Sequence, residues 1–161
     1  MFQHDARQEQ VYSFSRLDSE CLLSTVSNHR IELEDRSWPT AEHYYQAKKF
    51  TKTPIVEEIL AAEDGLLAYK LGNRWWKMGR NRDWKQNRRI MMTRCLYIKT
   101  QAHPEVKDAL LETGEERIVE TSLYDHYWGI GRDQRGENMM GQIWMDIRAK
   151  IKAGERARNN S

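Results

Sequence analysis

One short segment, residues 38–50, constrains the fold of this chain more than any other stretch. It reads Trp-Pro-Thr-Ala-Glu-His-Tyr-Tyr-Gln-Ala-Lys-Lys-Phe. Pro39 marks an entering loop, and the hydroxyl of Thr40 is suited to cap the first free N–H groups of a helix. From Ala41 onward, no residue breaks a helix before Thr51. We therefore predict a loop that leads into a short helix.

Three polar residues of this segment are spaced to share one face of that helix. Glu42, Gln46 and Lys49 follow one another in steps of four and three. Helical side chains lean toward the N-terminus, so Lys49 points back toward Glu42 and both can flank one bound group. Tyr45 and Phe50 add aromatic surface, which favours a partly covered face. An ordinary surface helix with solvated charges is the alternative.

Length and composition indicate an ordinary soluble domain. We expect one domain over residues 1–161, with a polar lead-in over about residues 1–10 and a frayed tail over about 154–161. No apolar run approaches the roughly 20 residues of a membrane span, and the first residues lack a signal-peptide core. Cys21 and Cys95 are far apart without a CxxC motif, which favours reduced thiols and a cytoplasmic location.

Positive charge is concentrated in the middle of the chain. Residues 70–99 contain ten Lys and Arg against a single acidic residue, Asp83. Trp75, Trp76 and Trp84 lie in the same stretch. A basic, tryptophan-rich segment suits a phosphate-bearing ligand or a nucleic acid, and a solvated helix face explains it equally well.

The remaining pattern predicts a mainly α fold, an orthogonal helical bundle with a few short β-strands. Helices are expected over residues 54–60, 64–71, 84–99 and 104–113 and from about residue 138, with short extended segments near 11–14, 23–33 and 118–121. The stripe expected to be buried in the third helix is Trp84, Arg88, Met91, Cys95 and Ile98, widened by Met92 and Leu96. In the last helix it is Met140, Ile143, Trp144, Ile147 and Ile151.

A loop rich in glycine and aromatic residues precedes that last helix. It places Asp125 beside Tyr127 and Trp128, and Gly129 and Gly131 permit a close approach of the backbone to a ligand. An acid held against aromatic rings is a candidate functional carboxylate. The alternative is a turn aspartate that binds its own backbone.

Several kinds of chemistry lack the motifs that they need. The histidines are scattered without the spacing of a metal site: His4, His29, His43, His103 and His126. No motif marks a Ser or Cys nucleophile, and the glycines lack dinucleotide-binding spacing. We therefore expect no metal and no cofactor. The catalytic groups that remain are carboxylates together with a lysine.

Such residues suit the cleavage of a ribosyl C–N bond. The sugar develops oxocarbenium character that a carboxylate stabilises, while the leaving nitrogen needs a proton. Glu42 or Asp125 can serve either end. Lys49 offers another route, because a deprotonated amine can attack the anomeric carbon of an opened sugar and form a Schiff base.

Several motifs in the same order resemble those of a known family. Beside residues 38–50 they are Arg82-Asp83-Trp84 leading to Met91, Tyr124-Asp125-His126-Tyr127-Trp128-Gly129-Ile130-Gly131, Gly136-Glu137-Asn138-Met139-Met140-Gly141, and Met145 to Arg148. From about residue 23 to residue 148 the chain resembles the NADAR family of YbiA-like N-glycosidases. Two positions depart from the family pattern: Thr25 replaces an Asn, and Asn73 replaces an Arg.

The resemblance implies a YbiA-like fold and an N-glycosyl hydrolase. Family members cleave phosphoribosylamino-pyrimidine intermediates of riboflavin synthesis, and related members remove ADP-ribose from guanine in nucleic acid. The family pattern matches the catalytic residues Glu42, Lys49 and Asp125 and ligand-proximal positions Trp84, Trp128, Gly129 and Asn138. With Tyr45, which lies beside the polar helix face, the last four form the predicted substrate-binding set.

The function that we predict is hydrolysis of a ribosyl C–N bond, first of all in a riboflavin intermediate. Glu42 is expected to act as acid or base, Lys49 as nucleophile or electrostatic anchor, and Asp125 to orient the sugar or share proton transfer. The alternatives are removal of ADP-ribose from guanine in DNA or RNA, a non-catalytic ADP-ribose or NAD-binding module, and nucleic-acid binding through residues 70–99. The expected partner is a phosphorylated ribosyl molecule or ADP-ribosylated nucleic acid, with no membrane, and the chain is expected to be a monomer.

Overall fold

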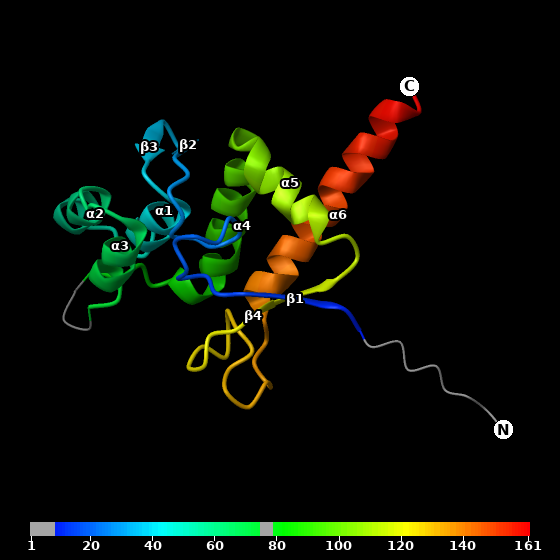
Figure 1. Ribbon diagram of the computed structural model, residues 1–161. Helices are drawn as coiled ribbons and strands as arrows, with labels where there is room; N and C mark the ends of the chain where they lie inside the picture. The colour runs from blue at the N-terminus through cyan, green and yellow to red at the C-terminus, as the bar shows by residue number, and fades with distance from the viewer. Residues whose placement is uncertain (1–8, 75–78) are drawn as a thin grey trace. The chain divides into compact units, whose positions relative to one another are not determined.

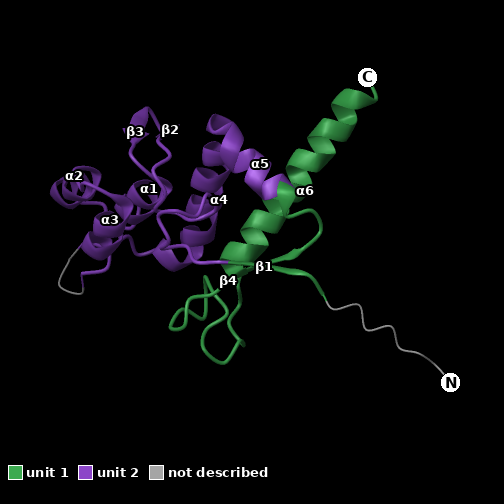
Figure 2. Ribbon diagram, in the orientation of Figure 1, with its two compact units in different colours: residues 1–13, 112–161 green, residues 14–111 purple. Residues whose placement is uncertain are grey.

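The computed structural model describes residues 9–74 and 79–161, which contain six α-helices and four short β-strands (Figure 1). They form two compact units (Figure 2). Unit 2 is Phe14–Leu111, and unit 1 joins the N-terminal segment to Glu112–Ser161. Trp75, Trp76 and Lys77, part of the basic segment considered above, lie outside the described residues. None of the helices in the described ranges is both long and apolar enough to cross a membrane.

A two-stranded hairpin precedes the central helix of unit 2. Strands β2 (Ile31–Leu33) and β3 (Arg36–Trp38) pair antiparallel, with Ile31 opposite Trp38. The connecting residues Glu34 and Asp35 both have positive φ, at 56° and 58°, which is the geometry of a tight type I′ turn. The end of the extended segment expected over residues 23–33 is therefore one strand of a hairpin, and β3 was not predicted.

Helix α1 (Ala41–Ala47) is the centre of unit 2, and all seven of its residues are buried. As predicted, Thr40 caps it, with its hydroxyl oxygen accepting a hydrogen bond from the backbone N–H of His43 at 3.3 Å. Helices α2 (Thr53–Leu60), α3 (Gly65–Gly72) and α4 (Trp84–Ala102) all contact it. The helix ends two residues before Lys49, earlier than the sequence predicts.

Helix α4 is followed by α5 (Pro104–Glu112). Its buried face consists of Met92, Cys95, Leu96, Lys99 and Thr100. Of the predicted stripe, Met92, Cys95 and Leu96 are buried. The prediction is wrong for the other four residues, which are only partly buried: Trp84, Arg88, Met91 and Ile98. Lys99 belongs to the core face because its amine is hydrogen-bonded there, a feature that hydrophobic periodicity alone does not show.

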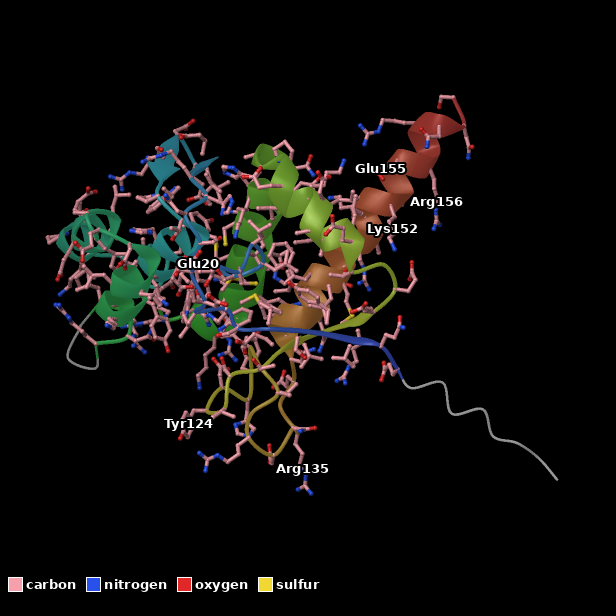
Figure 3. All side chains as sticks on the ribbon, viewed as in Figure 1. Glu20, Tyr124, Arg135, Lys152, Glu155 and Arg156 are labelled. Carbon is pink, nitrogen blue, oxygen red and sulfur yellow. The ribbon has the colours of Figure 1, made fainter. Side chains whose placement is uncertain are left out.

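Unit 1 combines a short strand pair with the long final helix. Strand β1 (Val11–Phe14) pairs with β4 (Arg117–Glu120), and α6 (Met139–Asn159) packs against β4. The predicted buried stripe of α6 is confirmed. The helix continues to Asn159, through the segment expected to fray. Figure 3 labels Lys152, Glu155 and Arg156 on its C-terminal half, and Tyr124 and Arg135 on the loop before it.

Substitution of Gly72, in α3, tests how tightly this helix packs on α1, and Gly154, in α6, provides the control. A Cβ added to Gly72 would lie 2.1 Å from the side-chain oxygen of Gln46 and 2.7 Å from its Cβ, whereas one added to Gly154 would meet nothing within 4 Å. We expect Gly72→Ala to lower the free energy of unfolding by about 1–3 kcal/mol through overpacking. Gly154→Ala should raise it by about 0.5–1 kcal/mol, since alanine favours a helix.

Denaturant unfolding of the two variants and the parent chain provides the measurement. Because both substitutions add the same methyl group to a helix, the difference between them reports the contact with Gln46. Equal stabilisation by both would show that α3 and α1 are not closely packed at this point.

Candidate active site

A buried ion pair occupies the centre of the candidate site in unit 2. Glu42, in the first turn of α1, is completely buried. Arg16 donates from Nη2 to both carboxylate oxygens, at 2.8 and 3.1 Å. Gln46 donates to Oε1 at 2.5 Å, and the hydroxyl of Thr25 donates to Oε2. Both oxygens of the carboxylate are therefore occupied.

This environment determines the protonation state of Glu42. Burial alone would raise the pKa of Glu42, but the Arg16 charge and the hydrogen bonds from Thr25 and Gln46 outweigh it and hold the pKa below its usual range. The carboxyl group is thus ionised at neutral pH. In this ionised form Glu42 has no proton to donate, which argues against the role of general acid that the sequence suggested for it.

Thr25 connects the two members of this ion pair. Its backbone N–H donates to the Arg16 carbonyl at 3.0 Å, and its carbonyl accepts from the Glu42 N–H at 2.9 Å. Thr25 is one of the two departures from the family pattern, and its hydroxyl is used to hold Glu42. Its main-chain and side-chain hydrogen bonds therefore fix both partners relative to each other.

Lys49 lies just beyond the C-terminal end of α1 and is 7% exposed. Its amine donates to Oδ1 of Asn73 at 3.0 Å, and Asn73 is itself held by a hydrogen bond from Nδ2 to the Tyr69 carbonyl at 2.8 Å. Asn73 is the second departure from the family pattern. An amide at this position accepts from the lysine, whereas an arginine would place a second cation beside it.

The ring of Tyr45 joins these groups into one cluster. The Arg16 guanidinium lies 5.6 Å and the Lys49 amine 5.4 Å from the ring centroid, distances typical of cation–π contacts. The Trp84 ring packs against the same tyrosine, with centroids 5.0 Å apart. Four predicted site residues, Glu42, Tyr45, Lys49 and Trp84, are thus brought together within unit 2.

The other four predicted residues lie in unit 1, in the loop before α6 and at its start. Asp125 accepts two hydrogen bonds at Oδ1, from the backbone N–H groups of Tyr127 at 3.0 Å and Trp128 at 2.7 Å. The turn role considered for Asp125 is therefore present. Among the described residues Oδ2 has no hydrogen-bond donor, so one oxygen can still accept from a ligand. A common site for Lys49 and Asp125 stays a prediction.

Asn138 and Gly129 are both positioned against strand β4. The amide of Asn138 accepts from the Glu120 N–H and donates to the Ile118 carbonyl, both at 2.9 Å. A Cβ on Gly129 would lie 2.3 Å from Oε2 of Glu120. The Asn138 side chain thus links the start of α6 to β4 and holds the two elements in register.

Besides Arg16, two ionisable residues with no exposed surface were not predicted from the sequence. Glu120 is completely buried and accepts hydrogen bonds from the backbone and hydroxyl of Ser122. Lys99 is also completely buried, and its amine donates to the Leu22 and Ser24 carbonyls, both at 2.7 Å, and to the Ser27 hydroxyl at 2.6 Å. Lys99 follows Cys95 and Leu96 at helical spacing, which places it on their face of α4, but a charged residue at that position does not by itself signal burial.

The basic segment 70–99 is partly neutralised within unit 2. Arg74 forms an ion pair with Glu58 at 2.9 Å, and Arg94 forms one with Glu34 at 2.6 Å. Lys99 has no exposed surface. Lys99 is therefore not part of an open basic surface, and Arg74 is partly exposed and Arg94 exposed, but both have acidic partners.

Comparison with known proteins identifies the family. The NADAR domain model matches residues 1–152. The chain belongs to the NADAR family. The resemblance recognised in its motifs is thereby confirmed.

Relatives of this NADAR chain carry names that agree with the expected hydrolase class. N-glycosidase YbiA of Escherichia coli is 30% identical over 149 residues, 92% of each chain. An N-glycosidase of Nostoc punctiforme is 36% identical over 136 residues, 81% of this chain and 85% of that one. A riboflavin biosynthesis protein of Vibrio vulnificus is 30% identical over 144 residues, 89% of this chain and 39% of that longer protein.

A solved structure confirms the YbiA-like fold of this NADAR chain. The NMR structure of E. coli YbiA matches it with a TM-score of 0.80 and 29% sequence identity. The match covers 92% of this chain and 88% of YbiA. The orthogonal arrangement of the helices stays a prediction.

Lys99 makes the stability of the NADAR chain depend on pH. Burial lowers the pKa of Lys99 to about 7 from its ordinary 10.5. Between these values the unfolded chain binds a proton that the folded chain lacks, so the free energy of unfolding rises with pH, and this contribution is lost as pH falls toward 7. One proton corresponds to at most about 1.4 kcal/mol per pH unit.

Denaturant unfolding between pH 7 and pH 9 measures this slope. We expect Lys99→Met to flatten it, because the titrating group is removed. Lys85→Met, at an exposed position in the first turn of the same helix, should keep the parent slope. Parallel curves for the parent chain and Lys99→Met would contradict the assignment, whatever their absolute stabilities.

Proposed function

We propose that this NADAR chain is an N-glycosidase that hydrolyses the ribosyl C–N bond of phosphoribosylamino-pyrimidine intermediates in riboflavin biosynthesis. The names of its relatives support the reaction class, and the riboflavin biosynthesis protein of V. vulnificus supports the substrate. The observation that carries the proposal is the position of Lys49. Its amine lies against Tyr45 and Asn73, in the cluster that also contains the buried Glu42.

In this reaction Glu42 has a positioning role. It is completely buried, it is neutralised by Arg16, and both of its oxygens are occupied by Arg16, Thr25 and Gln46, so it acts through these partners. It also fixes Arg16 against the Tyr45 ring.

Lys49 acts on the anomeric carbon. Its protonated amine gives a proton to the leaving nitrogen, and the free amine then forms a bond to C1 as the C1–N bond breaks. Nζ then passes a proton to the ring oxygen O4 as the C1–O4 bond breaks, which opens the sugar and leaves a protonated Schiff base between Nζ and C1. Water adds to C1, the C1–Nζ bond breaks, and the lysine and the free sugar are released. The net reaction consumes one water.

Each unit has groups of its own that suit a sugar or a base, and in unit 1 they lie in the loop before α6. Oδ2 of Asp125 is suited to accept a hydrogen bond from a ribose hydroxyl, while Oδ1 keeps the turn closed. Trp84, which is partly exposed and packs against the buried Tyr45, supplies aromatic surface for stacking on a pyrimidine. Trp128 packs edge-on against Tyr127, with ring centroids 4.7 Å apart, which orients a further ring in this loop.

Adjacent lysines provide a matched test of the catalytic assignment. Lys49→Ala should reduce turnover of a phosphoribosylamino-pyrimidine by roughly 10²–10⁴-fold or more, because it removes both the proton donor and the nucleophile. Lys48→Ala should keep turnover within about twofold, since the Lys48 amine pairs with Glu34 at 2.6 Å on a partly exposed surface. Release of the pyrimidine, followed by chromatography, is the measurement. Equal turnover of Lys49→Ala and the parent chain would remove Lys49 from the mechanism.

Borohydride reduction separates the two roles of Lys49. A Schiff base trapped during turnover adds the mass of the reduced sugar phosphate to the peptide that contains Lys49. Lys48→Ala should trap the same adduct, and Lys49→Ala should trap none. Turnover without any adduct would leave Lys49 as an electrostatic group only.

Guanine-ADP-ribosylated DNA and free ADP-ribose, assayed in parallel, distinguish the other functions. Faster release of ADP-ribose than of the pyrimidine would identify the nucleic acid as the substrate. Binding of ADP-ribose by calorimetry with no release of any base would identify a binding module.

A further inference from the structure

A cluster of two histidines and a glutamate lies in unit 2, apart from the residues described above. His29 lies two residues before β2, His103 caps the C-terminal end of α4, and Glu105 lies in the first turn of α5. Far apart in the sequence, the three residues place one potential ligand atom each within 4.8 Å of one another. We propose that His29, His103 and Glu105 form a binding site for a divalent transition-metal ion of the zinc class.

The distances fit a single ion with little rearrangement. Nε2 of His29 lies 3.2 Å and Nδ1 of His103 lies 3.6 Å from Oε1 of Glu105. Bonds of about 2.0–2.2 Å to tetrahedral zinc place neighbouring ligand atoms about 3.3 Å apart. Two imidazoles and one carboxylate are a common zinc ligand set, and water completes the fourth position where a site is open. Glu105 is half-exposed, so this position is reached by solvent.

Hydrogen bonds from outside the cluster orient both imidazoles. Nε2 of His103 lies 2.6 Å from the Arg30 carbonyl, which can only accept, so this nitrogen carries the hydrogen. In the neutral ring, Nδ1 then has the free lone pair, and it is the nitrogen that faces Glu105. Nδ1 of His29 lies 2.9 Å from the Ser27 hydroxyl oxygen; in the tautomer that binds a metal, Nδ1–H donates to this oxygen and the Nε2 lone pair faces Glu105. Metal-binding histidines are characteristically held in this way by a second partner.

A basic side chain lies next to the cluster. The amine of Lys99 donates to the Ser27 hydroxyl at 2.6 Å, and the same hydroxyl bonds Nδ1 of His29, so Lys99 opposes an incoming cation. We therefore expect affinity in the micromolar range.

Calorimetric titration of the metal-depleted full-length chain with Zn²⁺ tests the site. The parent chain should bind one ion per chain, with no comparable binding of Mg²⁺, which prefers oxygen ligands. Glu105→Gln and His103→Ala should each weaken binding by about 100-fold or more. Ser27→Ala should weaken it by roughly 10- to 100-fold, since it removes no ligand but takes away the orienting partner of His29, together with one acceptor of the Lys99 amine.

His126→Ala is the matched control. His126 and Asp133 form an exposed histidine–carboxylate pair at 2.9 Å, with no second histidine in the described structure around it. Its loss should leave the zinc affinity unchanged. Zn²⁺ should also raise the melting temperature of the parent chain and not that of Glu105→Gln, whose exposed side chain can be changed without disturbing the core.

The absorption spectrum of the Co²⁺ form gives an independent reading, because four-coordinate cobalt has intense visible bands. These bands should appear in the parent chain and be lost in Glu105→Gln. Absence of Zn²⁺ binding by the parent chain would overturn the proposal. So would equal affinities of the parent chain, Glu105→Gln and His103→Ala. None of these readouts depends on the proposed glycosidase activity.

Discussion

The Arg16–Glu42 ion pair is the interaction on which the rest of unit 2 depends. A carboxylate without exposed surface is tolerated only when its charge is matched and its lone pairs are used, and here Arg16, Thr25 and Gln46 meet both conditions. Removing one partner from such a pair typically costs about 3–5 kcal/mol, because the other charge stays buried. The pair is therefore a constraint on fold and on chemistry at once.

A second buried basic side chain, Lys99, holds the segment that contains Thr25. Lys99 binds the carbonyls of Leu22 and Ser24, which precede Thr25, and the hydroxyl of Ser27, two residues after it. Thr25 in turn connects Arg16 to Glu42 through its backbone. The segment is thus held by α4 and by α1 together. This explains why α4 places a lysine, instead of a further apolar residue, on its buried face.

The sequence predicted those features that follow from local patterns. The capped helix α1, the buried stripe of α6 and the cluster of Glu42, Tyr45 and Lys49 follow from spacing within one element or motif. The partners of Glu42 did not, because Arg16 lies in an irregular segment with no periodicity to mark it. Strand β3 was missed since its turn, Glu34-Asp35, lacks the glycine that usually signals a type I′ turn. The convergence of His29 and His103 depends on tertiary structure alone.

The partner of Glu42 also changes how the signature helix is understood. The spacing of Glu42 and Lys49 suggested that an acid and an amine act from one helical face, yet α1 ends before Lys49. Arg16 is the cation that neutralises Glu42, and Lys49 is directed to the amide of Asn73. The two basic residues thus have separate roles. Arg16 stabilises the buried charge of Glu42, and Lys49 takes no part in that ion pair. An amine whose carboxylate neighbour already has a partner can donate its proton and attack a carbon without first breaking a buried ion pair, which is what a nucleophilic lysine requires.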